Sequence, residues 1–126
     1  INYKSGPACE AGDWVEIYNP ANSSKNLSGW MLKDAKDNDP DHCFTLPKNT
    51  TVPAHGFLIF CKDVQKFHEY FPEVQATFGN MKFGLSSNGD QVRLFNSRAE
   101  TIDQLTYRSS APWPGSANGE GYTLEL

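Results

Sequence analysis

The chain consists of short apolar segments separated by glycine, proline, asparagine and aspartate, and the periodicity of an amphipathic helix is almost absent. Segments of about four to eight residues that alternate or carry β-branched side chains, with such residues at their ends, are typical of strands. About eight short strands without a long helix indicate an all-β sandwich or a small barrel. The predicted strands cover residues 13–19, 27–33, 43–46, 57–61, 101–107 and 122–126, with two more inside 83–96.

The most specific local signal lies within residues 83–96. Asn88 and Gly89 both tolerate positive φ, which the two-residue type I′ turn requires. A turn at this place would pair Leu85 with Val92, and the other apolar residues of the segment would fall on the same face. Because turn chemistry and apolar pattern agree on one register, we predict an antiparallel hairpin with Asn88 and Gly89 at its tip.

The strand predicted over residues 101–107 has an imperfect pattern. Leu105 and Tyr107 share one face, whereas Ile102 points to the other. A β-bulge, or a strand that is covered on both sides, would reconcile these positions.

One short helix is predicted over residues 63–70. Asp63 can cap its first turn, the apolar residues that follow are three and four apart, and Pro72 ends it. A helix of this length forms only when it packs against the rest of the domain.

Length and charge limit the classes of protein to which the chain can belong. A chain of 126 residues corresponds to a single domain, and its apolar fraction of 38% is that of a globular protein. The net charge is −4 and the eleven lysines and arginines are scattered, which argues against a nucleic-acid partner. The longest apolar run, residues 57–61, is far too short to span a membrane. No signal peptide is visible, and we expect one domain, residues 1–126, taken from a longer protein.

Three cysteines leave one unpaired if a disulfide forms. We predict a Cys9–Cys43 disulfide, because Cys9 precedes the first long strand and the chain returns to that end before Cys43. Cys61 would then be a free, buried thiol at the end of an apolar strand. A Cys43–Cys61 disulfide and three free thiols are the alternatives.

Motifs for catalysis are missing. The segment around Ser86 lacks the second glycine of G-x-S-x-G, and the segment that begins at His68 lacks the second histidine of H-E-x-x-H. We therefore expect no enzymatic activity and no cofactor, with calcium as the one exception to consider.

Asp37, Asp39 and Asp41 alternate as the ligands of a calcium loop do. His42 replaces the glycine that an EF-hand needs, and Lys48 stands where its closing glutamate would be. This excludes an EF-hand and leaves two hypotheses, an irregular calcium site or a solvated acidic loop.

Trp113 stands between two prolines, which stiffen the backbone around it. A rigidly held indole could stack on a sugar ring or a peptide, or it could close the open end of the sandwich. Trp14, Tyr18 and Trp30 are expected in the core because they lie in predicted strands. Glu16 is either an edge position or a buried, paired carboxylate.

Several segments in order resemble the lamin tail domain family: WVEIYN at 14–19, LSGW at 27–30, TVPAHG at 51–56 and LSSNGDQVRL at 85–94. The resemblance implies an immunoglobulin-like antiparallel β-sandwich with one short helix in an insert, and no catalytic residues. The helix-bearing insert over 63–81 and the Pro-Trp-Pro segment are similar to the bacterial branch, whose members are secreted or surface proteins.

The sequence and the resemblance together lead to one main hypothesis. We expect a non-catalytic, extracytoplasmic module, secreted, periplasmic or on the cell surface, without a transmembrane segment. It would position a neighbouring domain or bind a surface protein or glycan. The alternative is a carbohydrate- or small-ligand-binding module that uses Trp113, with calcium in the loop of Asp37, Asp39 and Asp41.

Overall fold

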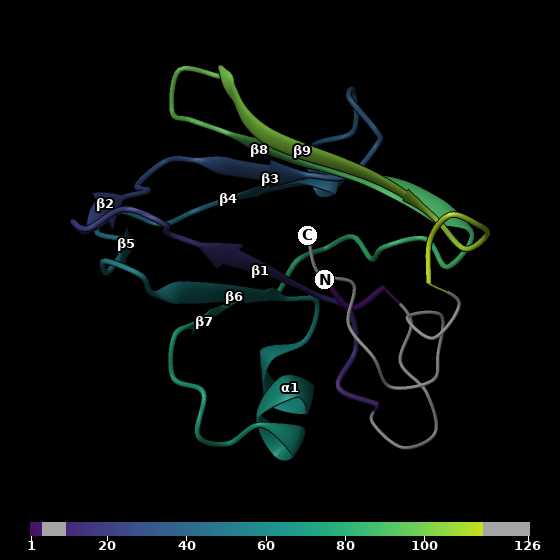
Figure 1. Cartoon of the computed structure of the whole chain (residues 1–126), viewed down its shortest axis with the longest axis horizontal. Coiled ribbons are helices and arrows are strands. Elements are labelled where there is room, and N and C mark those ends of the chain that lie inside the picture. The colour runs from purple at the N-terminus through teal and green to yellow at the C-terminus, as the bar shows by residue number, and fades with distance from the viewer. Residues whose placement is uncertain (4–9, 115–126) are drawn as a thin grey trace.

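Strands with alternating burial form two sheets that face each other across an apolar core (Figure 1). In this computed structural model, which describes residues 1–3 and 10–114, one sheet has the strand order β1-β6-β7 and the other β4-β3-β8-β9. A third sheet of two short strands, β2 and β5, lies at one end. The predicted all-β sandwich with one short helix is confirmed.

The three-stranded sheet joins β1 (Trp14–Tyr18), β6 (Phe57–Cys61) and β7 (Thr77–Phe78). β1 and β6 are antiparallel, with Val15 opposite the fully buried Phe60. β7 runs parallel to β6. The parallel pair departs from the purely antiparallel expectation because the helix-bearing insert between the two strands returns the chain in the same direction.

The four-stranded sheet is antiparallel throughout. Its strands, with those of the small sheet, are β3 (Met31–Lys33), β4 (Cys43–Thr45), β8 (Gly89–Phe95), β9 (Thr101–Arg108), β2 (Lys25–Asn26) and β5 (Thr51–Val52). The strand predicted over 27–33 is therefore shorter than expected, although Leu27 is buried. Between the sheets, the largest fully buried side chains of the main core are Tyr107, Phe60, Leu32, Leu46 and Val52.

The helix α1 (Val64–Tyr70) confirms the prediction over 63–70. The Asp63 carboxylate accepts a hydrogen bond from the backbone N–H of Lys66 at 3.0 Å, as an N-cap does. Phe67 is buried and packs edge-on against Trp14, so α1 covers the outer face of the three-stranded sheet. Within residues 1–3 and 10–114, no helix is long and apolar enough to cross a bilayer.

The predicted hairpin over residues 83–96 is wrong. A turn does occur before β8, and the Gly89 N–H donates to the Ser86 carbonyl at 3.3 Å. However, β8 pairs with β3 on one side and β9 on the other, so Leu85 does not pair with Val92. Because β3 and β9 occupy the two edges of β8, no edge is left for residues 83–87. Residues 83–86 instead pass along the core outside any sheet, and Leu85 is buried there.

The irregularity expected near Ile102 is a β-bulge. Leu94 lies opposite Asp103 and Phe95 lies opposite Thr101, so Ile102 has no partner on β8. Tyr107 is 1% exposed in the core, whereas the bulged Ile102 is 49% exposed. The strand predicted over 122–126 lies outside the described residues.

Candidate functional site

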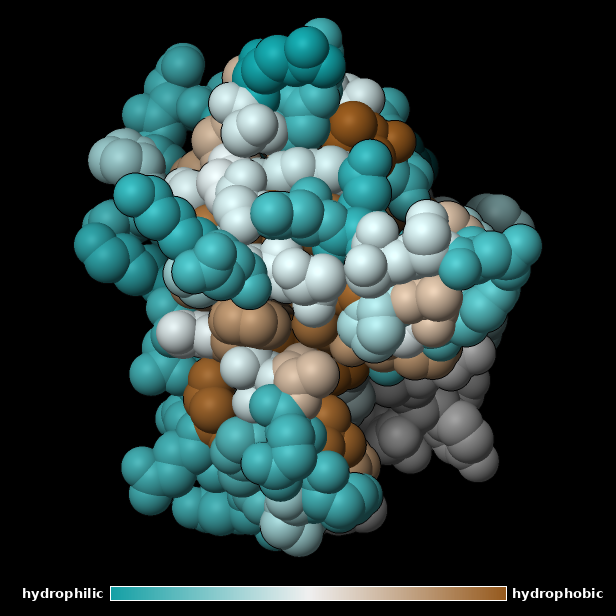
Figure 2. Space-filling model, turned by 90° about the vertical axis from the view of Figure 1, so that its left-hand side faces the viewer, coloured by the Kyte–Doolittle hydropathy of each residue, from teal (hydrophilic) through white to brown (hydrophobic). Residues whose placement is uncertain are grey.

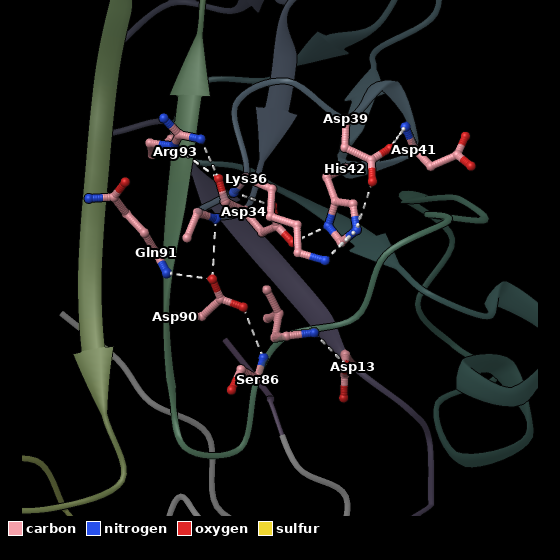
Figure 3. A network of polar contacts seen from close by, with 12 residues as sticks. Asp13, Asp34, Lys36, Asp39, Asp41, His42, Ser86, Asp90, Gln91 and Arg93 are labelled. Carbon is pink, nitrogen blue, oxygen red and sulfur yellow. Dashed lines mark hydrogen bonds and ion pairs between the residues drawn. The ribbon is translucent and has the colours of Figure 1, made fainter.

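The three aspartates of the acidic loop after β3 have different partners, and Figure 3 shows Asp39 beside His42 and Asp41. Asp37 pairs with the Arg93 guanidinium, and Asp41 pairs with the Lys82 ammonium at 2.8 Å. Asp39 accepts a hydrogen bond from the backbone N–H of Asp41 at 3.0 Å and caps a single 3-10 turn. Among the residues that the structure describes, no group of three or more His, Cys, Asp or Glu side chains could hold a metal ion. Calcium binding by this loop stays a prediction.

Two buried polar residues fasten this loop to the four-stranded sheet. The Asp34 carboxylate accepts a hydrogen bond from the backbone N–H of Lys36 at 2.9 Å and pairs with Nδ1 of His42. The Arg93 Nε–H donates to the Asp34 carbonyl at 3.0 Å, and the arginine is 9% exposed. Because buried charges are costly unless they are paired, these contacts fix the loop against β8. Their chemistry explains loop structure and does not require a ligand.

A second polar contact holds the extended segment before β8. The Asp13 carboxylate accepts a hydrogen bond from the backbone N–H of Leu85 at 2.8 Å. Burial raises the pKa of Asp13, and the Leu85 hydrogen bond and the Lys62 charge oppose this effect. The Tyr107 hydroxyl donates to the Ser86 carbonyl at 2.8 Å. Both contacts anchor backbone that no sheet supports.

Trp113 packs against the main core and is partly buried. Its backbone N–H donates to the Ser110 carbonyl at 3.2 Å, which holds the short turn that follows β9. This position agrees with the capping hypothesis for Trp113. Its role in ligand binding stays a prediction.

The cysteines lie at the ends of two strands. Cys61 ends β6, is fully buried and has a free thiol, as expected. Burial, with a smaller effect of the Asp63 carboxylate, raises the pKa of the Cys61 thiol to about 11. Cys43 begins β4, is half-buried and, like Cys61, has a free thiol among the described residues. Cys9, its predicted partner, lies outside the described residues, so the Cys9–Cys43 disulfide stays a prediction.

An apolar cleft of about 760 Å³ lies between β1 and β9, on the open side of the sandwich. Its lining includes Ile17, Leu27, Val52, Leu94, Ile102 and Leu105, with the indole of Trp30. Figure 2 views the end of the molecule with β2 and β5, where brown apolar surface shows between teal polar side chains. Unlike the residues of the polar network, several apolar side chains of this cleft are about half exposed in the described structure.

The two strands beside the cleft are both sheet edges. β1 is the first strand of its sheet, and β9 is the last strand of the other. In the described part of the chain, β1 makes one further backbone bridge, between Trp14 and Asn2. The same description gives β9 no strand partner other than β8.

A stacked aromatic pair stands at the rim of the cleft. Tyr18 of β1 lies opposite Phe57 of β6, their ring centroids are 4.7 Å apart, and each residue is 48% exposed. His55 contacts the Tyr18 hydroxyl at 3.4 Å and the Asn22 side-chain oxygen at 2.8 Å. Exposed apolar residues that are contiguous with an apolar groove are a signature of an interaction surface.

The expectation that Tyr18 is a core residue is wrong. Trp14, Glu16 and Tyr18 share the outer face of β1, and α1 covers only the Trp14 end of that face. The exposed Glu16 is an edge position between them. A charged residue between two aromatics on one face could have indicated solvent exposure. Trp14 and Trp30 are partly buried and pack against core clusters, as expected.

The model of one protein family, the Lamin Tail Domain, matches residues 1–109 of the chain. No curated protein matches it. The match includes β1, β9 and the cleft between them.

Proposed function

The chain belongs to the lamin tail domain family, whose members are non-enzymatic immunoglobulin-like domains, and from this premise we propose a function. The protein is an extracytoplasmic, non-catalytic interaction module that positions a neighbouring domain or binds a surface partner. The cleft between β1 and β9 is the surface through which it binds.

The cleft carries this proposal because it leaves large apolar side chains in contact with water. Tyr18 and Phe57 are each 48% exposed, and Ile102 is 49% exposed. Burying apolar surface contributes about 25 cal/mol per Å², so this area is available for binding. Convergent apolar side chains in a concave site are also the usual form of a ligand pocket.

The composition of the cleft favours a protein partner over a sugar. Its walls are mainly aliphatic, with Ile17 and Leu105 facing the gap from the two sheets. Aliphatic walls suit apolar peptide side chains, whereas sugar sites depend on aromatic faces and polar groups. Trp113, the tryptophan proposed for sugar stacking, packs against the core.

One observation favours a second candidate, a carbohydrate-binding module. The Tyr18–Phe57 pair stands beside polar side chains of Asn22 and His55, which a sugar hydroxyl could contact. In this case the binding surface is the aromatic rim, and the aliphatic cleft is secondary.

Two screens on the same protein separate these functions: a displayed random-peptide library and a glycan array. The cleft variant is Ile102→Lys, and the matched control is Tyr70→Lys, because Tyr70 is 42% exposed on α1 and does not line the cleft. We expect peptides to be enriched on the wild type and on Tyr70→Lys, but not on Ile102→Lys. Glycan binding alone, lost in Tyr18→Ala, supports the second candidate. Binding of neither class contradicts both.

The extracytoplasmic part of the proposal is supported by the resemblance to bacterial secreted and surface proteins. A Cys9–Cys43 disulfide, once established, would add support, because disulfides persist in oxidising compartments. Its test is the disulfide measurement described in the Discussion.

A further inference from the structure

β9 has eight residues, and in the described part of the chain it pairs only with β8, so no strand of that part occupies its other edge. An open edge presents backbone N–H and C=O groups that can pair with another chain. Natural edge strands are commonly protected by lysine, proline or a bulge, and in β9 the bulge at Ile102 affects only the beginning of the strand.

The geometry of the cleft suits a strand laid along this edge. Side chains of a strand alternate between its two faces, so every second residue of an added strand would point into the cleft. There it would meet Leu105 and Ile102 of β9 on one side and Ile17 of β1 on the other. The remaining side chains would face solvent. The rim pair Tyr18–Phe57 extends the apolar surface at one end.

The charges beside the cleft indicate the sign of the charge that a partner should carry. Glu16 and Asp103 border it from the two edge strands, and neither takes part in an ion pair within the described residues. Among the described residues, the hydrogen bond that the Asp103 carboxylate accepts comes from the adjacent backbone N–H of Gln104, at 2.8 Å. The one cation in the lining, Lys25, lies 6.0 Å from the centre of the Trp30 ring. Two carboxylates against one ammonium favour a basic ligand.

We propose that the partner presents an extended segment with alternating aliphatic residues and at least one lysine or arginine, which adds to β9 as a further antiparallel strand. This inference rests on the proposed function of the cleft as a protein-binding surface and names the partner's chemistry. Backbone pairing provides affinity, and the aliphatic and basic side chains provide specificity.

The test uses a synthetic ten-residue peptide in which valine and threonine alternate and a lysine stands near each end. Two matched peptides replace the lysines with glutamates or methylate consecutive backbone nitrogens, so that the donors on both edges of the peptide are removed. Fluorescence anisotropy measures binding to the whole chain. We expect the glutamate peptide to bind at least about tenfold more weakly than the lysine peptide. We expect the methylated peptide not to bind, because it cannot form backbone hydrogen bonds with a strand edge.

Matched protein variants locate the site. Asp103→Lys removes the proposed charge partner, and Glu69→Lys makes the same change at an exposed position on α1, away from the cleft. We expect Asp103→Lys to weaken binding of the lysine peptide and to strengthen binding of the glutamate peptide. Glu69→Lys should change the affinity of neither peptide. Amide hydrogen exchange should slow in β9 when the lysine peptide is bound. Circular dichroism and the melting temperature of each variant confirm that it folds.

The outcomes separate this inference from the proposed function. If peptides bind in the cleft but methylation has no effect and β9 amides stay unprotected, strand addition is wrong and the interaction function stands. If β9 amides become protected only as the protein concentration rises, the occupant is a second copy and the inference is wrong. If no peptide binds at all, both fail.

Discussion

At the scale of single residues, buried polar groups hold the parts of the chain that no sheet supports. Tyr107 and Asp13 come from distant segments, yet both fasten the stretch that precedes β8. Tyr107 also packs against Tyr3, with ring centroids 4.4 Å apart. Each contact therefore has an energetic consequence that a single substitution can measure.

Replacing Tyr107 with phenylalanine should lower the free energy of unfolding by about 1 kcal/mol, because the hydrogen bond from the buried Tyr107 hydroxyl to the Ser86 carbonyl is lost while the packing of the ring is kept. Urea denaturation of Tyr107→Phe measures the change. Tyr70→Phe is the control, since Tyr70 is exposed, and should leave stability unchanged. Equal stability of Tyr107→Phe and the wild type would mean that this hydrogen bond contributes nothing.

Asp13→Asn should change how stability depends on pH. Burial raises the pKa of Asp13 above its ordinary value of 3.8, so the folded state binds the proton more tightly than the unfolded state. The contribution of Asp13 to stability therefore falls as pH rises through its folded pKa. We expect the melting temperature of Asp13→Asn, relative to the wild type, to increase from acid to neutral pH and then level off. A pH-independent difference would contradict this.

At the scale of elements, pairing between strands that are distant in the sequence decides features that short sequence motifs do not determine. A turn forms at Ser87 and Asn88, one residue before the predicted position, and the strand that begins at Gly89 takes β3 and β9 as neighbours. The acidic loop shows the same principle. Its alternating aspartates match a calcium loop in sequence, while their carboxylates meet three different partners, a guanidinium, a backbone N–H and an ammonium.

Calcium should therefore leave the melting temperature unchanged. Binding to the folded state alone would stabilise the protein in proportion to the logarithm of the ligand concentration. Differential scanning fluorimetry with calcium and with a chelator measures the effect, and Asp39→Ala is the matched variant. A chelator-sensitive rise that Asp39→Ala abolishes would establish a calcium site in the loop.

At the scale of the whole molecule, α1 covers the outer face of the three-stranded sheet, and the cleft lies between the edge strands β1 and β9. The cysteines connect this architecture to the compartment of the protein, because a disulfide closing a long loop contributes about 3 kcal/mol and requires oxidising conditions.

We expect one titratable thiol, Cys61, in the unfolded, non-reduced protein, and a Cys9–Cys43 disulfide. In the folded protein at pH 8, Cys61 should not react with a thiol reagent, because it is buried and its pKa is raised to about 11. Peptide mapping without reduction identifies the linkage. Three thiols after unfolding, or a Cys43–Cys61 linkage, would refute the pairing and remove its support for an extracytoplasmic setting.

The sequence by itself determined the elements whose signals are local. Asp63 caps α1, Val15 and Ile17 set the inner face of β1, and Ile102 forms the bulge of β9. These features depend on residues within a few positions of each other, or on alternation along one strand. The family resemblance, carried by several such segments in order, was readable for the same reason.

Only the tertiary structure decided which strands are neighbours and which faces stay open. Leu85 looked like the partner of Val92, but Val92 pairs with Leu105. Tyr18 looked like a core residue, but α1 does not extend over it. The cleft is formed by β1 and β9, which lie near opposite ends of the described chain. No local signal specifies such a site, because strand pairing and exposure depend on which strands become neighbours in the folded chain.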